Sequence, residues 1–226
     1  DMASPQDLII LAPGTYNELV VMYKPVRLQG WGPYATVINA RKAPGEKLQL
    51  WRDKVSSLLT AGAFDLLPGQ EAGFAVTDNE PVLLFDAEGA GITVLGNITG
   101  RPRLQFRPGE HHARIDGIGI TGADHGGAIF VNGYTRGLEI SNNRLVANQG
   151  WFGGGIRVGT PDIADPTMKD LQNDNVRIGF NRILANGGTN LAGAIGLFNG
   201  TEAYEVAYND ICGNFSAEYG GGISHV

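Results

Sequence analysis

Cysteine, long hydrophobic stretches and positive charge are all scarce in this chain of 226 residues. The single cysteine, Cys212, excludes a disulfide within the chain. It adjoins Ile211, which is expected to face the core, so a small buried or bend residue is predicted rather than a reactive thiol. No apolar run approaches the roughly 20 residues of a membrane-spanning helix. The formal net charge of −6 argues against the basic surface that proteins use to bind nucleic acid.

Glycine, in contrast, is abundant. Its 34 copies are about twice the average share, which fits a fold with many sharp turns and a closely packed backbone. Disorder is the alternative explanation of a high glycine content, but 42% hydrophobic residues in a regular arrangement argue against it. A chain of this length can bury a sizeable core.

A motif recurs three times in the second half of the chain. Its copies lie at 138–148 with 153–158, at 176–186 with 193–197, and at 204–211 with 221–223. Equivalent positions such as Asn181 and Asn209 indicate coils of about 27 residues, a period typical of solenoid repeats. The wider interval between Asn143 and Asn181 indicates an insertion of about ten residues in one coil.

Each copy contains three short runs in which apolar residues alternate with other residues, as in Leu138-x-Ile140. Such runs are typical of strands, because successive side chains point to opposite faces. Three strands per coil at a fixed period predict an all-β fold, a right-handed parallel β-helix solenoid. Two columns of asparagine are expected to stack at its bends: Asn143, Asn181 and Asn209, and Asn148, Asn186 and Asn214. Asp116 is expected to extend the first column.

These repeats resemble those of the right-handed parallel β-helix proteins of the pectate-lyase-like superfamily. The opening is similar to the first coil of pectin methylesterases, with Leu-Ala-Pro-Gly-Thr-Tyr-Asn-Glu at 11–18, Lys-Pro-Val-Arg-Leu-Gln-Gly-Trp-Gly at 24–32 and Thr-Val-Ile at 36–38. The resemblance implies the fold. It does not extend to the catalytic motifs, since the glutamine, aspartate, arginine and tryptophan motifs of those enzymes are not matched.

The first half of the chain departs from the repeat. Residues 8–38 are expected to form the first coil, and strands are expected again at 82–85, 91–94 and 104–106. Between them, residues 41–80 are predicted to form a helical insertion, with an amphipathic helix over 44–59 that either covers the solenoid or docks a partner. We expect residues 1–226 to form one β-helix domain, cut from a longer chain.

One candidate site lies on the outer face of a predicted sheet. Glu139, Arg177 and Glu205 occupy outward positions in successive coils, so they should form a column with steps of about 4.8 Å. Two carboxylates about 9.6 Å apart are near the upper end of the separation in inverting glycosidases. A ladder of alternating charge, without catalysis, is the alternative.

A second candidate surface is the bend that precedes each glycine-rich strand. The residues expected there are Asp124, His125, Trp151, Phe152 and Tyr219. Exposed aromatic rings can stack on sugars, and a histidine beside an aspartate can act as an oriented base. Local packing of the rings and a solvated histidine are the alternatives.

No cofactor and no metal site is predicted, and calcium is the alternative. Four acidic residues, Asp162, Asp165, Asp170 and Asp174, lie in the insertion of the longer coil. They lack the regular alternation of ligands and the turn glycine of a calcium-binding EF-hand loop, so a solvated loop is favoured.

Three functions are consistent with this sequence. The leading hypothesis is a non-catalytic β-helix module of an exported or cell-surface protein, a scaffold that binds polysaccharide or a partner subunit. The first alternative is a polysaccharide lyase or glycoside hydrolase that uses Glu139, Arg177 and Glu205. The second is a filament or sheath subunit, which would form a homo-oligomer or larger assembly through its open sheet edges.

Overall fold

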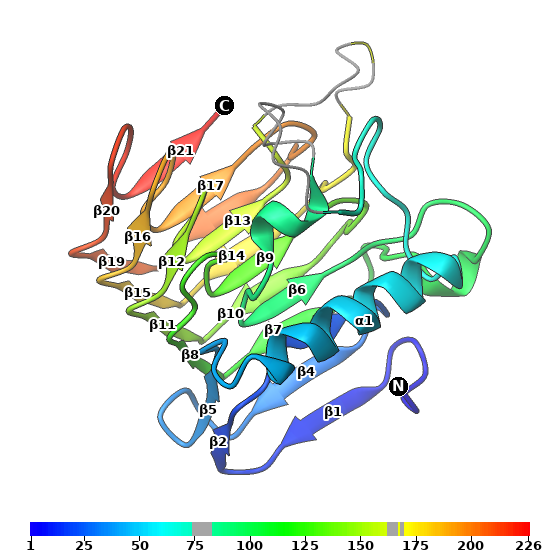
Figure 1. Cartoon of the computed structure of the whole chain (residues 1–226), viewed down its shortest axis with the longest axis horizontal. Coiled ribbons are helices and arrows are strands. Elements are labelled where there is room, and N and C mark those ends of the chain that lie inside the picture. The colour runs from blue at the N-terminus through cyan, green and yellow to red at the C-terminus, as the bar shows by residue number, and fades with distance from the viewer. Residues whose placement is uncertain (74–82, 162–166, 168–169) are drawn as a thin grey trace.

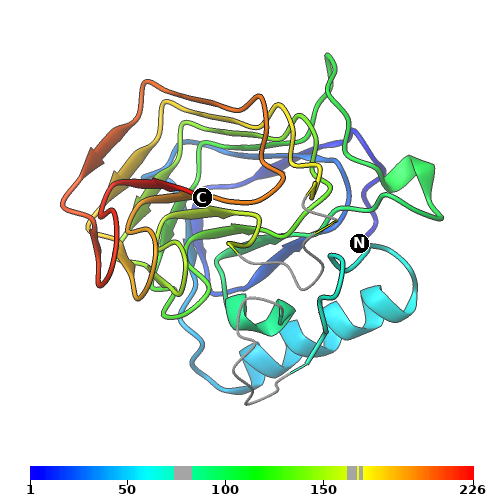
Figure 2. The same cartoon turned by 90° about the horizontal axis from the view of Figure 1, so that it is seen from above.

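The computed structural model describes residues 1–73, 83–161, 167 and 170–226. Within these ranges, short strands form four sheets in which all pairing is parallel, and the sheets wrap around a common core (Figure 1). The view in Figure 2 shows the coils lying one above another, with an α-helix outside them. The fold is the predicted all-β parallel β-helix solenoid with a helical insertion.

Three six-stranded sheets form the sides of the solenoid. Sheet A contains β1 (Leu8–Leu11), β4 (Arg27–Gly30), β7 (Arg114–Asp116), β10 (Glu139–Ser141), β14 (Arg177–Gly179) and β18 (Glu205–Ala207). Sheet B contains β2 (Gly14–Tyr16), β5 (Thr36–Asn39), β8 (Gly119–Thr121), β11 (Arg144–Val146), β15 (Arg182–Leu184) and β19 (Asp210–Cys212). Sheet C contains β3 (Val20–Met22), β6 (Ile92–Val94), β9 (Ile129–Val131), β13 (Ile156–Val158), β17 (Ile195–Leu197) and β21 (Ile223–His225). A short fourth sheet contains β12 (Gln149–Gly150), β16 (Gly187–Gly188) and β20 (Phe215–Ser216).

The pairing registers show where each coil ends. Leu8 pairs with Arg27, so the second coil already begins at β4, and the expectation that residues 8–38 form one coil is wrong. A tight turn between β3 and β4, closed by the Val26 N–H on the carbonyl of Lys24, makes this first coil short. The next coil is long because it carries the helical segment.

The later coils also differ in length. On sheet A, Arg114 pairs with Glu139, Glu139 with Arg177, and Arg177 with Glu205. The coil between Glu139 and Arg177 is the longest of these three, as the insertion expected from the sequence requires. The strands on either side of it nevertheless remain in register.

The inward side chains of the strands form one continuous core. On sheet A, for example, Ile115, Ile140 and Ile178 stack in register and are buried. Burying a side chain of this size contributes about 1.5–3 kcal/mol relative to its exposure, so a stack of such residues holds adjacent coils together. Cys212 does not join this core. It occupies an outward position at the end of β19, beside the bend at Gly213, and it is exposed, so of the two positions expected for it the structure supports the bend and not the buried one.

The two asparagine columns stack as predicted. Asn181 Oδ1 accepts hydrogen bonds from the backbone N–H and the side-chain amide of Asn143, at 3.0 and 3.1 Å. Its own amide donates to the carbonyl of Ile140 and to Asn209 Oδ1.

Asp116 does not extend the first column, contrary to expectation. It pairs with Ser141 of β10, which is two residues before Asn143, the column residue of that coil. The coil between β7 and β10 is shorter than the predicted period, and it places Ile118 where an asparagine was expected. The Ile118 N–H donates to Asn143 Oδ1, so the column ends on a backbone group.

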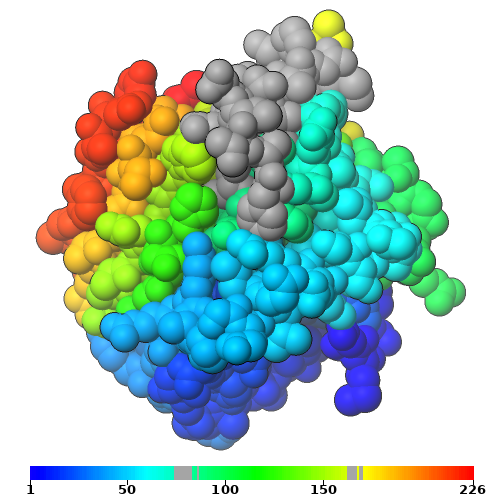
Figure 3. All heavy atoms as spheres, viewed as in Figure 1, coloured from blue at the N-terminus to red at the C-terminus, as the bar shows by residue number. Residues whose placement is uncertain are grey.

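The predicted helix is α1 (Glu46–Thr60). Trp51, Val55 and Leu58 form its buried face, which packs with Leu84, Phe85 and Phe130 against the outer side of sheet C. Figure 3 shows the helix, in cyan and blue, spread over this side of the molecule. The structure therefore favours the covering role over partner docking for this face of the helix.

3-10 helices overlap two segments expected to be strands, 82–85 and 104–106, and residue 82 lies outside the described residues. The helices are η2 (Leu84–Ala87) and η3 (Pro102–Leu104). The first packs its apolar residues beside α1, and the second has proline in its first turn, where the missing N–H is tolerated. Leu83 and Phe106 form isolated bridges only. Among the described residues, no helix is long and apolar enough to cross a membrane.

Candidate functional site

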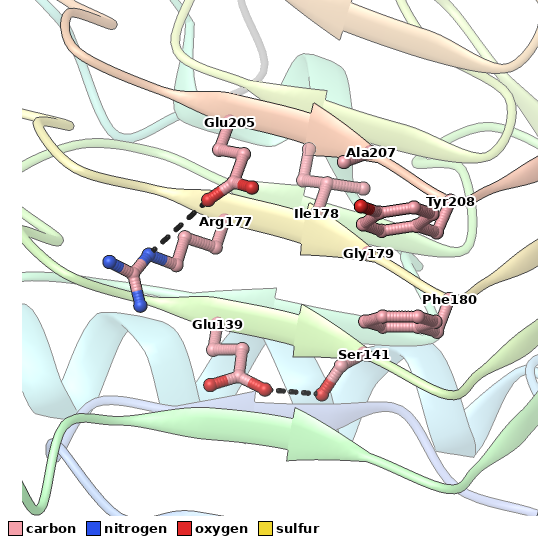
Figure 4. A pocket seen from close by; sticks show the side chains of 9 residues that line it. All are labelled: Glu139, Ser141, Arg177, Ile178, Gly179, Phe180, Glu205, Ala207 and Tyr208. Carbon is pink, nitrogen blue, oxygen red and sulfur yellow. Dashed lines mark hydrogen bonds and ion pairs between the residues drawn. The ribbon is translucent and has the colours of Figure 1, made fainter.

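The outer face of sheet A carries the column of charged residues expected from the sequence. Glu139 of β10 pairs with Arg177 of β14, which pairs with Glu205 of β18. All three side chains point away from the core into the same hollow (Figure 4). The sequence places these residues correctly because they alternate with inward residues in every strand.

The three side chains do not form one continuous charge ladder. Arg177 Nε lies 3.7 Å from Glu205 Oε2, and both side chains are largely exposed. An exposed pair of this kind contributes about 0–1 kcal/mol. Glu139 is bound differently, since Ser141 Oγ donates to its Oε1 at 2.7 Å and His112 Nε2 lies 2.6 Å from its Oε2.

The environment of Glu139 favours its ionised form. Partial burial acts to raise its pKa, but the hydrogen bonds from Ser141 and His112 and the charges of His112 and Arg114 outweigh this, and the pKa lies below its ordinary value. An inverting or retaining glycosidase needs one carboxyl group with a raised pKa as general acid. Glu139 does not meet this requirement.

His112 is a site residue that the repeat pattern does not reveal. It lies just before β7, and its Nδ1 is 2.8 Å from the carbonyl oxygen of Gly109. The residue belongs to the non-repeating loop between η3 and β7, so no column of equivalent positions marks it. The adjacent pair His111 and His112 is the feature of the sequence that could have drawn attention to this loop as part of a site.

Two exposed aromatic rings flank the charged column at the bend between sheets A and B. The rings of Phe180 and Tyr208 stack with centroids 5.0 Å apart and planes 12° from parallel (Figure 4). Phe180 is 60% exposed and Tyr208 is 77% exposed. Both residues have positive φ, a left-handed conformation that costs bulky residues about 1–2 kcal/mol.

The second bend of each coil provides an internal comparison. There the residue with positive φ, just before the other asparagine column, is Ala147, Ala185 or Gly213. Small residues therefore meet the conformational demand of such a bend. The fold does not require Phe180 and Tyr208 at their positions, so large exposed rings there call for another explanation.

The rings and the charged column line a surface hollow of about 220 Å³ that is open to solvent. It is lined by Glu139, Ser141, Arg177, Ile178, Gly179, Phe180, Glu205, Ala207 and Tyr208. A second hollow adjoins it, because Arg177 lines both, and this neighbour contains His112, Gly137 and Asn175. The surface thus offers an aromatic platform beside hydrogen-bonding groups of both kinds, which suits a hydroxylated ring.

The second candidate surface is only partly assembled. The rings of His125 and Trp151 meet edge-on at 5.6 Å, and Asp124 forms an ion pair with Lys42 at 3.1 Å. Burial, followed by the positive charge of Lys42, lowers the pKa of His125. Phe152 is 4% exposed, so its ring is part of the local packing, not an open stacking surface.

Tyr219, the fifth residue of that surface, is 65% exposed. Its backbone N–H binds Ser216 Oγ at 3.3 Å. It lies in the bend before β21, on a coil that follows those of His125 and Trp151. Its exposed ring makes it a useful reference position, because it resembles Tyr208 in size and exposure but lies outside the hollow on sheet A.

The structure describes two of the four acidic residues of the insertion. Asp162 and Asp165 lie outside the described residues. Asp170 accepts a hydrogen bond from the Gln172 N–H, and Asp174 pairs with Arg136 at 3.2 Å. Across the described part of the chain, no group of three or more histidine, cysteine or acidic side chains is arranged to hold a metal ion.

Comparisons with known proteins add no family to this description. No protein-family model matches the chain, and the searches of curated proteins and of solved structures found no significant match. The stacked parallel sheets are established by the structure, while membership of the pectate-lyase-like superfamily stays a prediction.

Proposed function

We propose that this chain is a non-catalytic β-helix module that binds polysaccharide on the outer face of sheet A. The observation that carries the proposal is the stacked, exposed pair Phe180 and Tyr208 beside the hollow that contains Glu139, Arg177 and Glu205. Phe180 and Tyr208 each cover one face of the other ring, so a sugar would contact their edges or the faces turned away from the pair, and the neighbouring charged groups would bind hydroxyls. As a polysaccharide-binding scaffold, it would work outside the cell or at its surface.

The ionised state of Glu139 supports a binding role over hydrolysis. Its carboxylate is held by Ser141 and His112, and Glu205 is paired with Arg177. The lowered pKa of Glu139 argues against a role of this group as proton donor. Carboxylates of this kind are acceptors for sugar hydroxyls without further change in their protonation.

The test is binding of the purified chain to a panel of neutral and acidic polysaccharides, measured by affinity electrophoresis and calorimetry. The double variant Phe180→Ala and Tyr208→Ala should lose binding by about tenfold or more, as expected for the loss of a stacking contact. Tyr219→Ala is the matched control and should bind like the wild type. Both variants change exposed residues, and alanine already occupies positive-φ positions at 147 and 185 of the second bend, so their unfolding should shift little. Equal binding by the wild type and the double variant would contradict the proposal.

A lyase or hydrolase that uses the same face is the second candidate. The observation that favours it is the short contact of 2.6 Å between His112 Nε2 and Glu139, which brings a histidine and a carboxylate together beside the hollow. His112 could act as a general base there only after Nδ1 leaves the carbonyl oxygen of Gly109, which lies 2.8 Å away. This candidate predicts the release of new chain ends from a bound polysaccharide, and their loss in Glu139→Gln. The filament hypothesis concerns the free edges of the terminal strands and stays a prediction.

A further inference from the structure

A third exposed aromatic residue lies on the same bend as Phe180 and Tyr208. Trp31 directly follows β4 of sheet A and is 68% exposed. It stands in a hollow of about 510 Å³ lined by Ile10, Gln29, Gly30, Trp31, Gly32, Pro33, Asp116, Gly117 and Asn142. No part of the proposed function above uses this residue or this hollow.

The backbone around Trp31 is held in place, although the ring is open to solvent. Its N–H donates to Thr36 Oγ1 at 3.0 Å, and that buried hydroxyl lies 3.2 Å from the carbonyl oxygen of Leu11. Gly30 approaches the next coil so closely that an added Cβ would lie 2.3 Å from the carbonyl oxygen of Gly117. A ring presented from a fixed bend loses little freedom when it binds a ligand, which favours affinity.

The bend therefore presents aromatic rings at two places along the solenoid axis. Registers on sheet A place Gln29 opposite Asp116, Asp116 opposite Ser141, and Ser141 opposite Gly179. The coils of Trp31 and Phe180 are thus three steps apart, about 14 Å at about 4.8 Å per step. The two coils between them carry Gly117 and Asn142 at the bend. Beside it, on the sheet B side, Tyr34 of the Trp31 loop reaches across these coils, and its hydroxyl accepts a hydrogen bond from Arg182 Nη1 at 2.8 Å.

Most charged side chains along this face are paired within the protein; the exception is Arg27 of β4, whose guanidinium lies 3.5 Å from the carbonyl oxygen of Gln6 and forms no ion pair with a described residue. Asp116 lies 3.3 Å from Arg114, Arg177 pairs with Glu205, and Glu139 is bound by Ser141 and His112. An acidic sugar would have to compete with carboxylates for the arginines, and a cationic sugar would have to compete with the arginines. A neutral chain can bind by hydroxyl contacts without breaking either ion pair.

We propose that Trp31 is a second stacking platform and that the ligand is a linear, neutral polysaccharide lying along the solenoid axis across both platforms. The inference rests on the proposed function and names its substrate class. Two linked contacts on one chain raise the affinity above that of either alone, because the second contact is made at high effective concentration.

The test is a length series of neutral linear oligosaccharides, from disaccharide to octasaccharide, with glucose and with xylose units. For the wild type, affinity should rise by about tenfold or more once the oligosaccharide spans both platforms. Trp31→Ala should bind the short members like the wild type and lose the rise, whereas Trp31→Phe, which keeps a ring, should retain most of it. Tyr219→Ala should behave like the wild type throughout.

Three results would overturn the inference. They are a rise that persists in Trp31→Ala, equal affinity of the wild type for short and long members, and a rise seen with oligouronates but not with neutral chains. Each of these leaves the role of Phe180 and Tyr208 intact if their double variant still loses binding. Unchanged binding after mutation of all three aromatic residues would instead reject the proposed function itself.

Discussion

The asparagine column at the second bend offers a sharp test of what holds the coils together. Asn186 is fully buried, and both ends of its side-chain amide are hydrogen-bonded. Its Oδ1 accepts from the N–H and the side-chain amide of Asn148, and its amide donates to the carbonyl of Leu145 and to Asn214 Oδ1. Asn186→Ala removes all of these bonds.

The magnitude follows from the groups left behind. Two buried backbone groups lose these partners, the Asn148 N–H and the Leu145 carbonyl. The unsatisfied Asn148 N–H costs about 1–3 kcal/mol, and the lost bond to the Leu145 carbonyl, which stays paired in the β11–β15 ladder, costs about 1 kcal/mol more, so the free energy of unfolding should fall by about 2–4 kcal/mol. In the variant, the Asn148 amide still donates to the carbonyl of Ile120, and Asn214 Oδ1 still accepts a hydrogen bond from the backbone N–H of residue 186. No larger loss is therefore expected.

The matched control is Asn214→Ala, one coil further along the same column. Asn214 makes the same bonds toward the preceding coil, but it is partly exposed and water can replace the lost partner. Its effect should be about 1 kcal/mol. Urea unfolding, monitored by circular dichroism, gives the free energy of unfolding of both variants. The dependence of this free energy on urea concentration should equal that of the wild type. If Asn186→Ala costs no more than Asn214→Ala, burial of the column is not what gives it its strength.

Two further predictions concern single side chains. The pKa of Glu139 is lowered in the folded protein, so its ionised form contributes stability above the ordinary carboxyl pKa, and this contribution is lost as the pH falls through the lowered value. Melting temperatures of the wild type and Glu139→Gln should therefore differ at neutral pH and converge on acidification; a gap that is the same at every pH would contradict this. Cys212 is exposed, so the native protein should react with a maleimide at the rate of a free thiol, as measured by mass spectrometry, and labelling that requires denaturant would show that the thiol is buried.

The repeat makes the second half of the fold predictable. Strands, registers and both asparagine columns can be read there because each coil repeats the same positions, and Asn143, Asn181 and Asn209 mark the period. The first half has no such marker. A short first coil and a long helical excursion break the period before it is established, so the sequence pattern does not reveal the coil boundary near Arg27 or the 3-10 helix Leu84–Ala87.

The candidate site is predictable to the extent that it repeats. Glu139, Arg177 and Glu205 follow from alternation, whereas His112 lies in a loop without equivalents in other coils. Phe180 and Tyr208 each directly precede an asparagine of the first column and therefore lie in the bend. The alternation of inward and outward residues applies only within a strand. Phe180 and Tyr208 lie just beyond the ends of their strands, so this pattern does not predict that their side chains are exposed.

The unequal coil lengths have a consequence for how such a protein can change. The step from Glu139 to Arg177 is longer than the step from Arg177 to Glu205, yet the strands on either side keep their register. The extra residues lie between β13 and β14, outside the strands, so the strand pairing of the adjacent coils is kept. The corner after β13 is therefore a natural position for inserting a foreign peptide or domain, and the rigid stack of coils would hold the insert at a set distance from the aromatic residues of sheet A.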